Sequence, residues 1–219
     1  FAGASLLLPA RQALAQNARR LTAGTRSINV NGRSASVFGI TDENGQPGLI
    51  LGPDERFDLS LENRSGVPTI IHWHGQVPPP EMDGVTDTGY VRPIDDGAAA
   101  SYNFMPRPGT HWMHSHQGLQ EQTLMAAPLI VRTREDVSAD LQEVVVLLHD
   151  FSFRSPDEIL QGLGGGTGMN HGGMASPEPM AGMNMDRSAM TMGSMDLNDV
   201  QYDAFLANDR TLDDPEVIR

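Results

Sequence analysis

Short runs of alternating hydrophobic and polar residues, separated by turn residues, fill the chain from about Ser27 onward. The run FDLSLEN at 57–63 places Phe and Leu at every second position, with polar residues between them. A period of two is typical of a strand with one buried face. The dipeptide Asn31-Gly32 stands between two further runs, SINV and RSASVFGI, and is typical of a two-residue hairpin turn.

Further segments have the length and composition of strands: TIIHWHG, ASYNFMP, GTHWMHSH, APLIVR and the fully apolar QEVVVLLHDF. About seven such strands, with turn residues between them, predict an all-β domain, an antiparallel β-sandwich with Greek-key connections. The one helical expectation is SPDEILQGL, a short helix capped by Ser155 or Asp157.

The composition changes abruptly after Leu163, where Gly and Met dominate. Eight of the twelve methionines lie between Met169 and Met195. Because this stretch has no periodic apolar face, it predicts a flexible linker over 162–198. A strand-like sequence pattern resumes at 199–219. We therefore expect one complete domain over 27–150, then the linker, and then the start of an incomplete second domain.

The N-terminal stretch FAGASLLLPARQALAQ is small and apolar and contains Ala13-Leu14-Ala15. This pattern is typical of the end of a secretory signal cleaved after Ala15, so 1–15 is interpreted as a residual signal segment and the protein as periplasmic or secreted. The alternative is an amphipathic N-terminal helix. No other stretch is apolar over the roughly 20 residues that a membrane span needs.

The net charge and the cysteine content argue against several classes of partner and of chemistry. The formal net charge of −13 argues against nucleic acid and anionic membrane surfaces as partners. The absence of cysteine excludes disulfides, thiolate zinc sites and thiolate nucleophiles within this chain.

Five of the seven histidines lie in two short windows, IHWHG and GTHWMHSHQG. Since residues i and i+2 of a strand point to the same side, His72 projects with His74, and His114 with His116. Two such strands can direct four imidazoles into one space. Four neutral nitrogen ligands favour copper, with zinc or nickel less distinctive. Histidines packed beside tryptophan are the alternative, which the double pairing disfavours.

The other histidines differ from these pairs. Strand parity puts His111 on the opposite face, which predicts a structural or auxiliary contact. His149 lies in an apolar run, where a core or domain-interface position is expected, and His171 lies in the Met-rich segment.

The sequence IHWHG, followed by PPPEMDGV and then GTHWMHSHQGLQEQ, resembles the first cupredoxin domain of the multicopper oxidases. The continuation HSHQGLQEQ and the Met-rich segment are most similar to the bacterial copper-resistance, CopA-type branch. The resemblance covers roughly 27–150 and again the last twenty residues. It implies a cupredoxin-like fold and a three-copper cluster that reduces dioxygen to water, with electrons supplied by a separate blue copper near the substrate.

The resemblance also assigns roles by position. It implies that His72 is a type 2 copper ligand and that three residues are type 3 ligands: His74, His114 and His116. Asp83, nine residues after His74, matches the acid that supports proton delivery during oxygen reduction. Asp83 is equally suited to open an Asp-Gly turn, and one residue can do both.

The chain departs from the family where the remaining ligands are expected. Outside the window HWMHSH at 111–116, the chain has no H-x-x-H-x-H motif, and it has no H-C-H motif with the cysteine of the type 1 copper. We therefore expect the N-terminal part of a longer oxidase, inactive alone, whose partners are dioxygen, a Cu(I) or phenolic reductant and the remaining domains of the enzyme.

Two alternatives stay open. One is a non-catalytic periplasmic copper-binding or buffering protein, and the other is a relative of two-domain laccases or nitrite reductases that pairs half-sites across subunits. In each case the methionines have two interpretations: thioethers that gather Cu(I), or a plain tether.

Overall fold

A computed structural model describes residues 18–164 and 200–218. The chain divides into two compact units. The first contains the described residues up to Ser27 together with Ser36–Val145, and the second contains Ile28–Ala35 together with the described residues from Val146 onward. The expected signal segment and most of the Met-rich segment lie outside the described residues.

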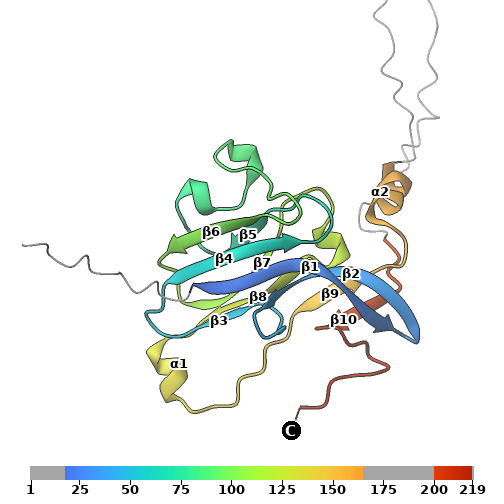
Figure 1. Cartoon of the computed structure of the whole chain (residues 1–219). Helices are drawn as coiled ribbons and strands as arrows, with labels where there is room; N and C mark the ends of the chain where they lie inside the picture. Colours follow the sequence, from blue (N-terminus) through green and yellow to red (C-terminus); the bar gives the residue numbers. More distant parts are fainter. Residues whose placement is uncertain (1–17, 165–199, 219) are drawn as a thin grey trace, which may run out of the picture. The chain divides into compact units, whose positions relative to one another are not determined.

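Two four-stranded sheets build the sandwich (Figure 1). The first has the order β2-β1-β4-β6 and is formed by β1 (Arg19–Val30), β2 (Arg33–Asp42), β4 (Phe57–Arg64) and β6 (Ala99–Phe104). The second has the order β3-β8-β7-β5 and is formed by β3 (Leu49–Leu51), β8 (Ala126–Val131), β7 (Gly109–Ser115) and β5 (Ile71–His74).

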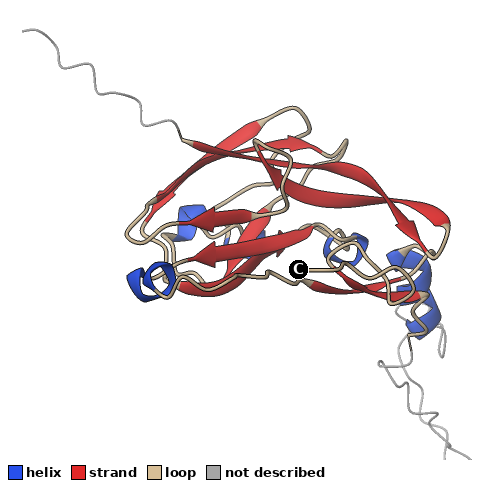
Figure 2. Ribbon diagram, turned by 90° about the horizontal axis from the view of Figure 1, so that it is seen from below, coloured by secondary structure: helices blue, strands red, loops and turns tan. Residues whose placement is uncertain are grey.

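The hydrophobic core lies between these two sheets, which form separate layers in Figure 2. Trp73 of β5 is fully buried, and its ring lies 4.7 Å from that of Phe57 in β4 and 4.9 Å from that of Tyr102 in β6. Phe57 also stacks on Phe104 at 4.4 Å. These aromatic contacts join the layers directly, so the strand with the first histidine pair is anchored by its core-facing side.

The predicted all-β sandwich is confirmed, but its sheets are mixed. β1 pairs with β4 in parallel, and β3 pairs with β8 in parallel. Turn spacing predicts pairing between neighbours in the chain, whereas here the connections cross between layers and bring distant strands together.

Strand β1 begins at Arg19, ahead of the expected start near Ser27. Its early part buries Leu21 and Ala23, and the small residues Ala23 and Gly24 obscure the alternation in the sequence. The hairpin turn at Asn31-Gly32 is confirmed, since both residues have positive φ.

Short helical turns shape the loops of the first unit. They are η1 (Pro80–Met82), η2 (Thr86–Thr88), η3 (Glu121–Thr123) and α1 (Arg134–Ser138). η1 follows the first histidine pair and η3 follows the second. Asp83, at the end of η1, contacts His72, and Glu121 of η3 contacts His114.

The second unit contains β9 (Leu148–Phe151), which pairs antiparallel with β10 (Ala204–Ala207), and α2 (Pro156–Gly164). Ser155 caps α2, because its hydroxyl accepts from the Glu158 N–H at 3.2 Å. The long apolar strand expected from QEVVVLLHDF is wrong in extent: only 148–151 is strand, because β10 offers a partner of only four residues. Among the described helices, none has the length and apolar character to cross a membrane.

Candidate metal centre

The two histidine-bearing strands are neighbours in the second sheet. β5 pairs antiparallel with β7 so that His72 lies opposite His114, and Trp73 lies opposite Met113. Trp73 and Met113 are both fully buried in the core. Alternation along each strand therefore turns the imidazoles to the other face of the sheet.

Four imidazoles gather on that face. One ring nitrogen from each of His72, His74 and His114 lies within 4.8 Å of the other two. His116 follows the end of β7, and its ring lies 4.7 Å from that of His72 and 4.9 Å from that of His114. The structure thus brings together the four histidines singled out in the sequence, three from strands and one from the residue that follows β7.

His72 is held by the segment that follows η1. Its Nδ1 lies 2.8 Å from the backbone oxygen of Asp83 and 3.5 Å from the Asp83 carboxylate. A carbonyl oxygen can only accept, so Nδ1 carries the proton and Nε2 keeps a free lone pair. Gly84 permits this approach, because it has φ +74° and a Cβ there would lie 1.9 Å from the Ile71 carbonyl oxygen.

Trp73 also fixes this segment from the core side, since its indole N–H donates to the Met82 carbonyl at 2.9 Å. The loop that carries Asp83 is therefore attached to β5 on both of the strand's faces. Asp83 lies at a bend directly before Gly84 and beside His72, and its role in proton delivery stays a prediction.

His114 is held differently. Its Nδ1 lies 2.8 Å from Oε2 of Glu121, and its ring stacks on Trp112 with centroids 4.0 Å apart and planes 9° from parallel. Its Nε2 is buried and, among the described residues, has no hydrogen-bond partner. A buried ring nitrogen beside three other imidazoles, with its lone pair unused by the protein, suits a metal ligand.

Glu121 was not found by sequence reasoning. It belongs to η3, seven positions beyond His114, where no strand periodicity applies. The only trace in the sequence is the polar run QGLQEQ, whose glutamate and glutamines could equally be solvent-exposed.

Burial and neighbouring imidazoles favour the neutral form of His114 and His116. Burial lowers the pKa of His114, and this outweighs the nearby Glu121 carboxylate, which raises it. Burial also lowers the pKa of His116, with His72 as the next cause. Neutral imidazole is the form that binds metal.

The other described histidines stay outside the cluster. The Nε2 of His111 lies 3.2 Å from the Arg107 carbonyl and 3.3 Å from the Pro108 carbonyl, and its ring packs against Gly75. His111 thus makes the structural contact expected of it. His149 lies in β9 in the second unit, and His171 lies outside the described residues.

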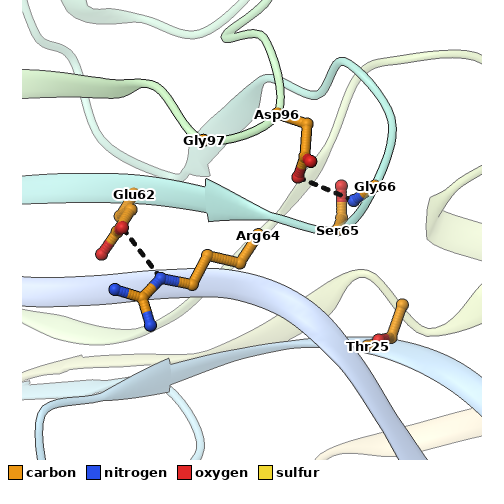
Figure 3. A pocket seen from close by; sticks show the side chains of 7 residues that line it. All are labelled: Thr25, Glu62, Arg64, Ser65, Gly66, Asp96 and Gly97. Carbon is orange, nitrogen blue, oxygen red and sulfur yellow. Dashed lines mark hydrogen bonds and ion pairs between the residues drawn. The ribbon is translucent and has the colours of Figure 1, made fainter.

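A polar cavity of about 470 Å³ opens elsewhere in the first unit, at the end of β4 (Figure 3). Its charged groups have partners: Glu62 forms an ion pair with Arg64 at 2.8 Å, and Asp96 accepts from the backbone N–H of Gly66 at 2.9 Å. With its polar groups already satisfied in this way, the cavity is a weaker candidate than the histidine cluster.

A β-sandwich in which four imidazoles converge from neighbouring strands is typical of one class of protein, the β-sandwich domains that bind a metal. The donor set fits copper, because neutral nitrogen ligands accept both of its oxidation states. His72 and His114 each have Nδ1 occupied by a hydrogen bond, and the Nε2 of His114 has no hydrogen-bond partner among the described residues.

Comparison with known proteins narrows the class. Residues 22–136 match the multicopper oxidase family. The chain is 34% identical to copper resistance protein A of Escherichia coli over 166 residues, which is 74% of this chain and 27% of that protein. It is 33% identical to copper resistance protein A of Pseudomonas syringae pv. tomato over 159 residues, 71% of this chain and 26% of that protein.

Solved structures agree on the fold. The McoA multicopper oxidase of Aquifex aeolicus superimposes with a TM-score of 0.53 and 25% identity, covering 63% of this chain and 33% of that one. The chain belongs to the multicopper oxidase family. It spans about a quarter of the length of the curated copper-resistance relatives that it matches.

Proposed function

We propose that the chain is the N-terminal part of a multicopper oxidase that couples one-electron oxidation of Cu(I) or phenolic substrates to four-electron reduction of dioxygen to water. Its contribution is half of the ligands of a trinuclear copper cluster, with His72 at the type 2 copper and three residues at the type 3 coppers: His74, His114 and His116. The observation that carries this proposal is the convergence of these imidazoles, with the buried Nε2 of His114 left without a partner among the described residues.

Bound copper would supply the electron transfer to dioxygen. The chain's own residues hold the ligand nitrogens and manage protons. Asp83 fixes the tautomer of His72 through its backbone oxygen, which leaves its carboxylate free to hold a proton beside the cluster. That side chain is 29% exposed, so it can exchange the proton with solvent as oxygen is reduced.

The type 1 copper belongs to sequence outside this chain, because no cysteine is present to ligate it. The lengths of the relatives support this arrangement, since the chain matches about a quarter of each. A periplasmic or secreted location is supported by the N-terminal A-x-A pattern and by the similarity to copper resistance proteins.

The proposal is tested on the full-length protein with all four histidines of the cluster changed to alanine. Copper bound per molecule should fall, and oxygen consumption with Cu(I) or with a phenol should be lost. The matched control is His111→Ala, which removes a histidine from the same strand without touching the cluster. Oxygen consumption that survives the fourfold change would refute the proposal.

A second candidate is a copper-binding protein without catalysis, favoured by the absence of an electron-entry cysteine in this chain. The two candidate functions predict different encoded sequences after Arg219. An H-C-H motif there supports the oxidase, and its absence supports the buffer. In both cases we expect the 219-residue chain alone to bind copper but to show no oxidase activity and no intense blue absorption.

A further inference from the structure

Two contacts fix the ring of His114. Trp112 lies parallel to the ring and fixes its plane. Glu121 lies at the ring edge and fixes rotation within that plane through the 2.8 Å contact to Nδ1. The side chain of His114 is 7% exposed, so water cannot replace either contact readily.

Glu121 is itself held in place by the residue before it. The Gln120 side-chain oxygen accepts from the hydroxyls of Thr69 at 2.6 Å and Ser115 at 2.7 Å. Its amide nitrogen donates to the Pro68 carbonyl at 2.9 Å. Both ends of the Gln120 amide are thus bonded to the strand ends, and η3 begins at a fixed point beside β7.

We propose that Glu121 is a positioning residue for His114: its carboxylate accepts a hydrogen bond from Nδ1–H, which keeps the proton on Nδ1 and aims the lone pair of Nε2 at the metal site. This inference rests on the proposed function, in which His114 is a copper ligand. Without an acceptor at Nδ1, the proton can sit on Nε2, where it blocks coordination.

The comparison with His72 makes the inference specific. The Nδ1 of His114 has a carboxylate oxygen at 2.8 Å, whereas the Nδ1 of His72 has the backbone oxygen of Asp83 at 2.8 Å and the Asp83 carboxylate farther away at 3.5 Å. A carboxylate acceptor polarises an imidazole more strongly than a carbonyl does, so His114 is the stronger donor of the pair. The two strands therefore supply ligands of unequal strength to one site.

The experiment uses the full-length protein and its Glu121→Leu and Glu121→Gln variants at one fixed pH. Leucine removes the acceptor, and glutamine keeps an acceptor oxygen without the charge. Gln122→Leu is the matched control, because Gln122 is exposed in the same turn. The readouts are the ¹⁵N NMR tautomer of His114 in metal-free protein, the affinity for added copper and the thermal unfolding midpoint.

We expect wild type and Gln122→Leu to hold the proton of His114 on Nδ1. Glu121→Leu should mix the two tautomers and weaken copper binding about tenfold, the lower end of the usual range because the Glu121 side chain is 37% exposed. Glu121→Gln should weaken copper binding by less than Glu121→Leu.

A wild-type tautomer and wild-type copper affinity in Glu121→Leu would overturn the inference. If that variant does not fold, Glu121→Gln decides on affinity alone, and an unchanged value overturns it. Failure of the proposed function looks different: wild type would then bind copper no better than the protein with all four histidines of the cluster changed to alanine, whatever Glu121 does to the tautomer.

Discussion

Replacing Gly84 by alanine should disconnect Asp83 from His72. A Cβ at Gly84 would lie 1.9 Å from the Ile71 carbonyl oxygen and 3.0 Å from the Cα of His72. Real Cβ atoms keep about 3.0 Å or more from such an oxygen, so the backbone has to move by about 1 Å. The contact at stake, from the Asp83 oxygen to Nδ1 of His72, is only 2.8 Å long and does not survive such a shift.

The loss in the free energy of unfolding caused by Gly84→Ala has three parts. The left-handed conformation at φ +74° costs a non-glycine residue about 1 kcal/mol. Losing the hydrogen bond to His72 costs about 1 kcal/mol. Straining the neighbouring bond from the Trp73 indole to the Met82 carbonyl costs about 1 kcal/mol more. The expected loss in the free energy of unfolding is therefore about 3 kcal/mol, accompanied by weaker copper binding.

Gly89→Ala is the control, because Gly89 lies in the same loop with φ +77°, and a Cβ added there would have no atom within 4 Å. It should lose only the conformational part, about 1 kcal/mol, and keep its copper affinity. Urea unfolding and copper titration of both variants measure the difference. Equal losses of stability and of copper affinity in the two variants would show that the close approach at Gly84 does not hold Asp83 against His72.

Three more outcomes follow from other residues. Burial raises the pKa of Tyr102 to about 12, so the unfolded chain releases this proton near pH 10 while the folded chain keeps it. The free energy of unfolding should therefore fall by about 2 kcal/mol as pH rises from 10 to 12, and Tyr102→Phe should remove that fall in urea titrations. Asn63→Ala should cost about 2 kcal/mol or more in chemical unfolding, because the buried Ser65 N–H loses the Asn63 oxygen as its acceptor. Exposed Asn103→Ala should cost about 1 kcal/mol or less. Removing thioethers from the Met-rich segment should slow oxidation of Cu(I) at low free copper and leave phenol oxidation unchanged, and equal effects on both substrates would make the segment a plain tether. The changes are to leucine at four positions: Met183, Met185, Met190 and Met192.

Strand parity was enough to predict the histidine cluster. Residues two apart share a face in any regular strand, so each pair could be assigned from the sequence, and β5 and β7 proved to be neighbours. Glu121 could not be assigned in this way. It reaches His114 because a turn after β7 folds back, and the direction of that turn depends on the contacts of Gln120 with distant Thr69.

The strand pairing also escaped prediction. A hairpin is encoded locally, as Asn31-Gly32 shows, but nothing near Arg19 or Leu49 in the sequence specifies a parallel partner. Those pairings are selected by packing of the whole core, in which β1 and β3 each bury apolar side chains against strands far along the chain. The same reason explains why the apolar run before β9 became a strand only where β10 pairs with it.

The order of the strands has a consequence for how the protein acquires its metal. Arg19 pairs with Leu59 and Leu49 pairs with Leu129, so both sheets close only after long stretches of chain have been brought together. Topologies with such high contact order fold slowly, over about milliseconds to seconds. Each His-x-His pair, by contrast, is already complete in the unfolded chain and can chelate an ion there. With the ligand set proposed above, copper that arrives early would be held by half-sites and would compete with the pairing of β5 and β7, so the timing of metal supply relative to folding would become part of the assembly of this site.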